Sequence, residues 1–150
     1  MSRLSETLIT NRELVHPHHA TGLETVHGGN VMKWMDEVGA MAAMRFAGQP
    51  CVTAHINSID FERPIQVGDT ALINAYVYAA GTTSVRVRVK VFRENPFTGE
   101  TEWTTESYMV YVAIDGDHEP SPVPDLLIED AEDRELQTAA LDGEPENSTQ

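Results

Sequence analysis

One long segment, residues 30–47, restricts the fold of this chain more than any other feature, because it is apolar on nearly every side. Its apolar residues recur at intervals of three and four positions, which predicts one helical face: Val31, Trp34, Met35, Val38, Met41 and Ala42. The charged residues within it are few: Lys33, Asp36, Glu37 and Arg45. Gly48 and Pro50 end the predicted helix. A helix with so few polar positions is buried, so the rest of the chain must surround it.

Strands are predicted on both sides of this helix, at residues 7–15, 51–61, 69–79, 84–92 and 103–114. Valines alternate strictly with Arg86, Arg88 and Lys90 in one of them, which indicates a strand with one buried face. A change of phase within 51–61 predicts a bulge. Short turns join the strands after the helix, so we expect antiparallel neighbours. One antiparallel sheet must then wrap the helix, which makes this an α+β domain.

The length of 150 residues suits one domain, and its net charge of −14 lies mostly at one end. Residues 115–150 hold twelve acids and one arginine, a net charge of −11, which leaves −3 elsewhere. We expect a folded domain over 1–115 and an acidic, extended or disordered tail over 116–150, with a short helix at 126–141. Two lysines against 24 acids suit the high-salt cytoplasm of a halophilic archaeon. An acidic tail on an ordinary protein explains the charge about as well.

Several classes of protein are disfavoured by what the sequence lacks. No apolar run is long enough to cross a membrane, and the N-terminus resembles no signal peptide, so a cytoplasmic protein is expected. The single Cys51 excludes an intrachain disulfide framework. His16, His18 and His19 have no acid or cysteine at ligand spacing, so no metal site is predicted. No nucleic-acid motif and no serine nucleophile elbow occurs.

Asp36 is the strongest candidate for catalysis. It lies off the core face of the predicted helix, in a sector of small or uncharged neighbours: Gly29, Met32, Gly39, Ala40 and Ala43. Such surroundings leave room for a substrate and favour a general base; the alternative is an exposed aspartate paired with an arginine of another chain. Gly28 and Gly29 precede the helix, where free amides stabilise a developing negative charge, unless they only form a turn required by packing.

Basic residues offer weaker candidates for binding an anion such as a phosphate. Arg86, Arg88 and Lys90 share one strand face, which is more often simply solvated or paired with acids. Arg63, before Pro64, is either a phosphate ligand or structural.

Five short blocks, in this order, resemble the hotdog-fold acyl-CoA thioesterases, in particular the broad-specificity bacterial and archaeal acyl-CoA hydrolases. They are VHGGNVMKWMDE at 26–37, VTA at 52–54, DFERPI at 60–65, VGD at 67–69 and GTTS at 81–84. The resemblance covers about residues 14–114. It implies a sheet wrapped around one long helix, and hydrolysis of an acyl-CoA thioester without metal or cofactor.

The resemblance also implies roles for individual residues. Asp36 matches the catalytic carboxylate, which activates water or attacks the thioester itself. The amide near Gly29 would stabilise the oxyanion, and Thr53 would position water or substrate. Coenzyme A contacts are expected at Gly28, Asn30, Arg63, Pro64, Thr82, Thr83, Ser84, Arg86 and Arg88. Two subunits would pair side by side with the active sites at their interface, often as a hexamer of three dimers, with no nucleic acid or membrane as partner.

Two departures from the family pattern occur in the same loop. Thr21 stands where relatives commonly have an asparagine that assists at the reacting centre, opposite the partner subunit's aspartate. Glu24 stands where many relatives have glycine. The replacement at Thr21 keeps a second hypothesis open, a non-catalytic protein that binds acyl-CoA or lipid. A dehydratase or hydratase of the same fold needs a histidine paired with an acid, an arrangement that the sequence does not show.

Overall fold

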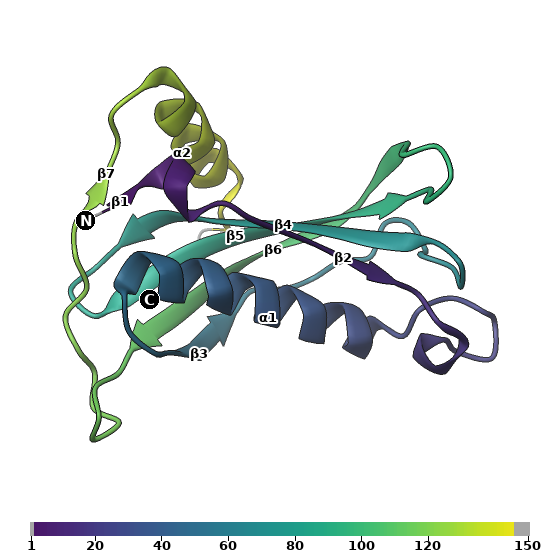
Figure 1. The fold of residues 1–150 in the computed structure, drawn as a ribbon, viewed down its shortest axis with the longest axis horizontal. Helices are drawn as coiled ribbons and strands as arrows, with labels where there is room; N and C mark the ends of the chain where they lie inside the picture. The colour runs from purple at the N-terminus through teal and green to yellow at the C-terminus, as the bar shows by residue number, and fades with distance from the viewer. Residues whose placement is uncertain (1, 146–150) are drawn as a thin grey trace.

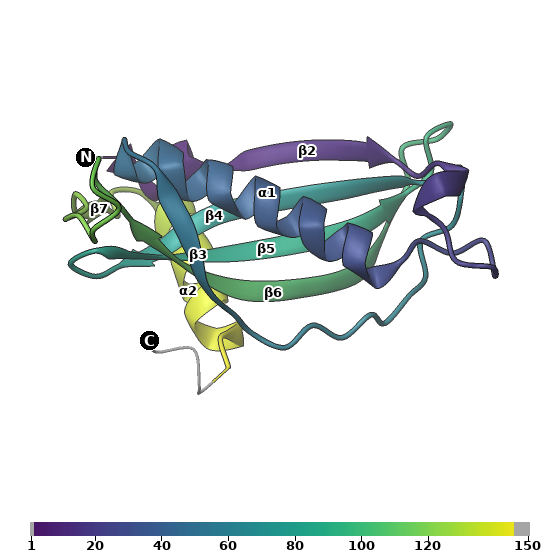
Figure 2. The same ribbon diagram turned by 90° about the horizontal axis from the view of Figure 1, so that it is seen from below.

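A five-stranded antiparallel sheet lies between two helices in the computed structural model, which describes residues 2–145 (Figures 1 and 2). The order across the sheet is β2 (Ile9–Leu14), β4 (Thr70–Ala80), β5 (Ser84–Glu94), β6 (Thr101–Ala113) and β3 (Cys51–Ile56). The long helix α1 (Gly28–Ala47) runs along one face, and α2 (Ala131–Gly143) packs on the other. The remaining elements are β1 (Ser2–Arg3), β7 (Leu126–Leu127), and the 3-10 helices η1 (Leu4–Thr7) and η2 (Pro17–His19).

The main core fills the space between α1 and the sheet, as predicted from the apolar helix. The alternating valines of β5 all face α1 and are buried: Val85, Val87, Val89 and Val91. The helix begins at Gly28, two residues before the predicted start, and ends before Gly48, whose φ of 69° is left-handed. That conformation favours glycine and closes the helix. Among the described residues, no helix is long and apolar enough to cross a membrane.

Strand β3 does not pair with β4, the next strand in the chain, although the sequence predicted antiparallel pairing of consecutive strands after the helix. Strands β4, β5 and β6 are neighbours in sequence and in the sheet, whereas β3 pairs with β6 at the far edge. The bulge lies between Thr53 and His55, and the strand ends at Ile56 rather than at residue 61. Beyond Ile56 the chain stays against β6. The amides of Asn57 and Glu62 donate to the carbonyls of Tyr108 and Thr104, and the hydroxyls of Ser107 and Thr105 donate to the carbonyls of Asn57 and Asp60. This connection then leads the chain past β6 and β5 to β4, the neighbour of the opposite edge strand β2.

The C-terminal segment is more ordered than the predicted acidic tail. Residues 126–127 pair with β1, and the helix runs from Ala131 to Gly143 instead of over 126–141. Asp130 caps this helix by accepting a hydrogen bond from the Asp133 amide at 2.9 Å. Its Ala140 is buried in a second apolar cluster with Tyr76 and Tyr78 on the outer face of the sheet. Of the residues predicted to lack structure, 142 and 143 belong to α2, and 146–150 lie outside the described residues.

Candidate active site

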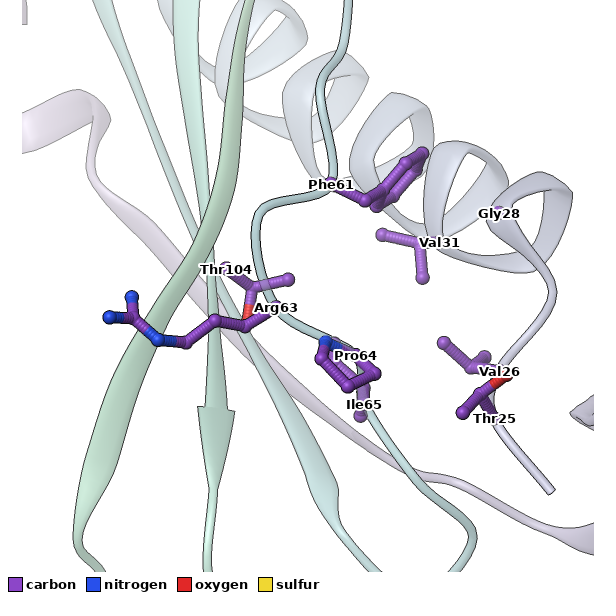
Figure 3. Close-up of a pocket in the computed structure, with 9 residues that line it drawn as sticks. All are labelled: Thr25, Val26, Gly28, Val31, Phe61, Arg63, Pro64, Ile65 and Thr104. Atoms are coloured by element: carbon purple, nitrogen blue, oxygen red, sulfur yellow. The ribbon is translucent and has the colours of Figure 1, made fainter. Parts of the chain in front are cut away.

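A cavity of about 330 Å³ lies beside the N-terminus of α1 (Figure 3). It is lined by Thr25, Val26, Gly28, Val31, Phe61, Arg63, Pro64, Ile65 and Thr104. A Cβ atom on Gly28 would lie 3.3 Å from the Phe61 ring, so the missing side chain keeps this wall open. The Arg63 guanidinium points away from the cavity and donates to the Trp103 carbonyl at 3.2 Å. Three predicted binding residues, Gly28, Arg63 and Pro64, therefore border one cavity.

The first turn of α1 has backbone amides without partners. The His27 carbonyl accepts from the amides of Asn30 and Val31, at 3.0 and 3.3 Å. Across residues 2–145, nothing accepts a hydrogen bond from the amide of Gly28 or Gly29, as expected for a helix start. Gly29 is exposed, so its amide is open to a ligand. The Asn30 side chain instead donates to the His19 carbonyl at 3.0 Å and ties the preceding loop to the helix.

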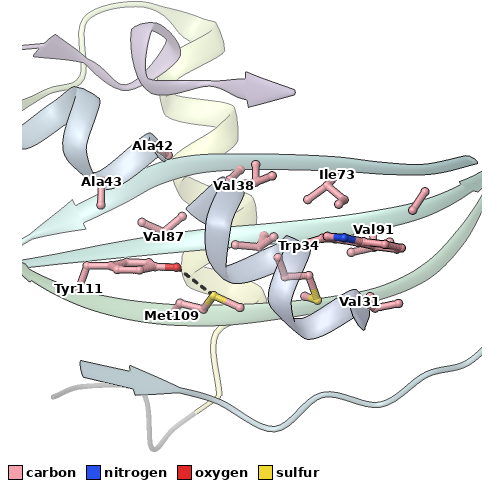
Figure 4. Close-up of a cluster of buried hydrophobic side chains, with 14 of the residues drawn as sticks. Val31, Trp34, Val38, Ala42, Ala43, Ile73, Val87, Val91, Met109 and Tyr111 are labelled. Carbon is pink, nitrogen blue, oxygen red and sulfur yellow. Dashed lines mark hydrogen bonds between the residues drawn. The ribbon is translucent and has the colours of Figure 1, made fainter. Parts of the chain in front are cut away.

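Asp36 and Thr53 meet, although 17 residues separate them in the chain. The Thr53 hydroxyl, on edge strand β3, donates to Asp36 Oδ1 at 2.8 Å. A second donor to Oδ1 is the hydroxyl of Tyr111, on the neighbouring strand β6, at 3.0 Å. Tyr111 is fully buried beneath α1, where its hydroxyl also lies 3.3 Å from Met109 Sδ (Figure 4). Two adjacent strands thus hold one carboxylate oxygen.

The sequence analysis did not identify Tyr111. It interpreted the room beside Asp36, next to small residues such as Gly39, as space for a substrate. The gap beside Gly39 is filled by the phenol of Tyr111, since a Cβ atom on Gly39 would lie 2.5 Å from that hydroxyl. A tyrosine on the inward face of the last strand was the available signal, because a buried phenol needs a hydrogen-bond partner. Burial, and then the nearby charge of Asp36, raise the pKa of Tyr111, so its hydroxyl keeps its proton and acts as a donor.

Arg86 and Arg88, predicted to contact coenzyme A, lie on the outer face of the sheet, away from Asp36. Arg86 pairs with Glu144 at 2.9 Å, and Arg88 pairs with Glu106 at 2.7 Å. Tyr78 also donates to Glu144, so these side chains join α2 to the sheet. These ion pairs support the alternative that the basic face of this strand is paired with acids.

Thr82 and Thr83 lie in the β4–β5 turn and Ser84 begins β5, at the C-terminal end of α1 (Figure 1). The carbonyls of Thr82 and Thr83 accept from the amides of Val123 and Ala113. Within one chain, this turn and the cavity lie at opposite ends of the helix.

Thr21 lies in the loop before α1 and is occupied by local contacts. Its hydroxyl accepts from the Leu23 amide at 3.1 Å and shares a hydrogen bond with the Thr25 hydroxyl at 3.2 Å. The next residues form a tight turn in which Glu24 has a φ of 61°. Thr21 and Glu24 therefore belong to one turn.

The histidines and the cysteine show no reactive arrangement. His16, His18 and His19 touch one another, with ring centroids of His18 and His19 4.0 Å apart. Burial and its two neighbours lower the pKa of His19. Residues 2–145 contain no group of three or more histidines, cysteines or acids that could hold a metal ion. Burial raises the pKa of the Cys51 thiol to about 11, which disfavours the reactive thiolate.

Comparison with known proteins identifies the family. A family model described as the thioesterase superfamily matches residues 23–99. The chain belongs to this superfamily. It is 33% identical to the uncharacterized acyl-CoA thioester hydrolase YkhA of Bacillus subtilis over 136 residues, which cover 91% of this chain and 79% of the relative.

Solved structures of this superfamily share the fold. An acyl-CoA hydrolase from Staphylococcus aureus, in complex with butyryl coenzyme A and coenzyme A, superposes with a TM-score of 0.85 at 32% identity, over 95% of this chain and 86% of that one. A hexameric acyl-CoA thioesterase superposes with a TM-score of 0.85 at 35% identity, over 95% and 92%. Alanine variants of the Staphylococcus aureus enzyme, at one asparagine, one aspartate and one threonine, superpose similarly.

Proposed function

We propose that this thioesterase-superfamily protein hydrolyses the thioester of acyl-CoA to a free acid and coenzyme A. The observation that carries the proposal is the carboxylate of Asp36, held by Thr53 on edge strand β3 of a hotdog sheet. Relatives that match most of the chain are named acyl-CoA thioester hydrolases. In the proposed reaction, the Asp36 carboxylate either takes a proton from the water that attacks the thioester carbonyl carbon, or attacks that carbon itself to form an anhydride that water then hydrolyses. In both routes the C–S bond breaks, the coenzyme A sulfur leaves as a thiolate that takes up the proton released from water, and a free amide near Gly29 stabilises the oxyanion.

The positions replaced in the Staphylococcus aureus enzyme support these assignments. There the aspartate follows the asparagine by 15 positions, and the threonine follows the aspartate by 17. Thr21, Asp36 and Thr53 have the same spacing in this chain. Threonine therefore stands at the asparagine position, and its shorter side chain predicts a lower rate or a different acyl group.

We further propose that each active site combines two copies of the chain. Asp36 follows Gly29 by seven residues, which places them about 10 Å apart along the helix axis. One thioester carbonyl cannot lie within about 3 Å of both a base and an oxyanion donor at that separation. The face beside Asp36 is also open, because Met32 and Val52 are exposed there and β3 is an edge strand. A second copy on this face would bring its Gly29 to Asp36, within a dimer or a hexamer.

The deciding experiment measures thiol release from acyl-CoA esters ranging from acetyl to palmitoyl. The wild type should turn over part of the panel, and Asp36→Asn should reduce kcat by at least about 100-fold. Glu37→Gln is the matched control, since it neutralises the next acid on the same helix and should leave the rate unchanged. A residual rate in Asp36→Asn equal to that of the wild type would refute the assignment.

The alternative function, a non-catalytic acyl-CoA or lipid-binding protein, is favoured by one observation. Thr21 replaces the asparagine, and its hydroxyl is already bonded within its loop. This alternative predicts calorimetric binding of acyl-CoA by the wild type without turnover, and the appearance of turnover in Thr21→Asn.

Two further expectations accompany the proposal. The chemistry uses acyl-CoA as substrate and no cofactor, so a chelator should leave the rate unchanged. We also propose that the protein works in the cytoplasm, and that its many acids suit high salt. Comparing rates at low and molar salt tests the second part of that proposal.

A further inference from the structure

Tyr111 differs from the other tyrosines buried in the described chain, because its hydroxyl reaches the proposed site. It lies 3.0 Å from Asp36 Oδ1 and 3.0 Å from the Asp36 backbone carbonyl oxygen. The hydroxyl thus contacts both the side chain and the backbone of Asp36, and it shares its one proton among these two oxygens and the sulfur of Met109. The buried hydroxyls of Tyr76 and Tyr78 instead contact Leu136 and Glu144, on the other side of the sheet.

The two carboxylate oxygens of Asp36 are unequal as a result. Oδ1 accepts from both Thr53 and Tyr111, whereas Oδ2 accepts from no residue among 2–145. Donors on one oxygen fix the carboxylate plane and leave the lone pairs of the other oxygen free. A general base or nucleophile needs that free oxygen in a defined position.

Gly39 is the structural requirement for this contact. Any side chain at position 39 would approach the Tyr111 hydroxyl, since its Cβ atom would lie 2.5 Å away and also 3.2 Å from Val89. The tyrosine ring is fully buried, so it has little room to turn away. The glycine of the helix and the tyrosine of the sheet thus fit each other.

We propose that Tyr111 is a positioning residue that, with Thr53, occupies Oδ1 of Asp36 and leaves Oδ2 to react. This inference deepens the proposed thioesterase function and rests on it. Loss of the phenol donor should therefore loosen the geometry of the Asp36 carboxylate and slow the chemical step, with less effect on substrate binding.

The test compares Tyr111→Phe with Tyr76→Phe, which deletes a buried phenol that does not contact Asp36. Carboxyl-carbon NMR of isotopically labelled aspartate, assigned with Asp36→Asn, follows the surroundings of this carboxylate at one fixed pH and needs no turnover. In Tyr111→Phe the Asp36 carboxyl resonance should move, because one of its two donors is lost. In the same variant kcat should fall about tenfold at nearly constant KM. Tyr76→Phe should change neither.

A second variant covers the case in which Tyr111→Phe fails to fold. Replacement of Tyr111 by 3-fluorotyrosine keeps the ring and strengthens the donor, so the Asp36 carboxyl resonance should move in the direction opposite to that in Tyr111→Phe. An unchanged Asp36 resonance in the folded Tyr111 variants would overturn the proposal, leaving Tyr111 a packing residue. A wild type without turnover would instead count against the thioesterase function, while the NMR signal still decides whether Tyr111 holds Asp36.

Discussion

Glu24 adopts a backbone conformation that suits glycine, in the turn just before the proposed site. Its φ of 61° lies in the left-handed region, which costs a residue with a side chain about 1–2 kcal/mol. Its amide donates to Thr21 and its carbonyl accepts from Val67, and both bonds use the backbone only. Glycine would keep these bonds and remove the strain.

We therefore predict that Glu24→Gly raises the free energy of unfolding by about 0.5–1 kcal/mol, once the greater freedom of glycine in the unfolded chain is subtracted. Urea denaturation measures the change. Glu24→Ala is the control, because it removes the same side chain but keeps the strain. An equal gain in Glu24→Ala would show that backbone strain is not the cause.

How well the site residues were predicted depends on how local their signals are. Asp36 and Gly29 belong to one short motif, and their positions on the helix follow from its period. A role for Thr53 was predicted only from the family resemblance, and its hydrogen bond to Asp36 was not predicted, because β3 reaches the helix through long-range packing. Tyr111 was missed because its contact with Asp36 depends on how β6 is positioned under α1. No local sequence pattern determines that position.

Helix α2 is the element whose role the sequence least revealed. Its Asp133 is fully buried, and it accepts from the amides of Ser5 and Glu129 at 2.9 and 3.0 Å. Arg3 lies 3.6 Å from the same carboxylate. The N-terminal segment and the loop before α2 therefore both contact the carboxylate of Asp133 on α2. Counting acidic residues does not distinguish the buried Asp133 from its exposed neighbours. The segment was therefore predicted to be an acidic, extended or disordered tail with a short helix.

Asp133→Asn is predicted to lower the free energy of unfolding by about 2–3 kcal/mol at pH 7, because it leaves buried donors facing a weaker acceptor. Burial disfavours the charge of Asp133, but backbone hydrogen bonds from Glu129 and Ser5 outweigh it and lower its pKa below 3.8. A lowered carboxyl pKa stabilises the fold above pH 3.8, and that stabilisation is lost as the pH falls further.

Denaturation curves from pH 7 to pH 3 test this prediction. The gap between the wild type and Asp133→Asn should be largest near neutral pH and should shrink below pH 3.8. Asp142→Asn, at an exposed position of the same helix, is the matched control and should change stability by less than about 0.5 kcal/mol. A gap that stays constant over the whole range would contradict the role given to the charge.

At the scale of the whole molecule, the separation of Gly29 and Asp36 along α1 leads to a test of assembly. If each site takes Asp36 from one copy and the loop with Gly29 from another, two inactive variants should complement each other. Asp36→Asn disables the base, and Gly29→Pro removes an amide donor at the helix start, where proline is otherwise tolerated. A mixed dimer then holds one site with both defects and one site with neither.

Refolding equal amounts of the two variants together should give random pairing, with half of the dimers mixed and one of the two sites in each intact. The expected rate is about one quarter of the wild-type rate, measured by thiol release, when each variant alone is at least about 100-fold slower. Refolding each variant separately and mixing afterwards is the control. A mixture no faster than its components, although mass spectrometry detects mixed dimers, would mean that each chain carries its own complete site.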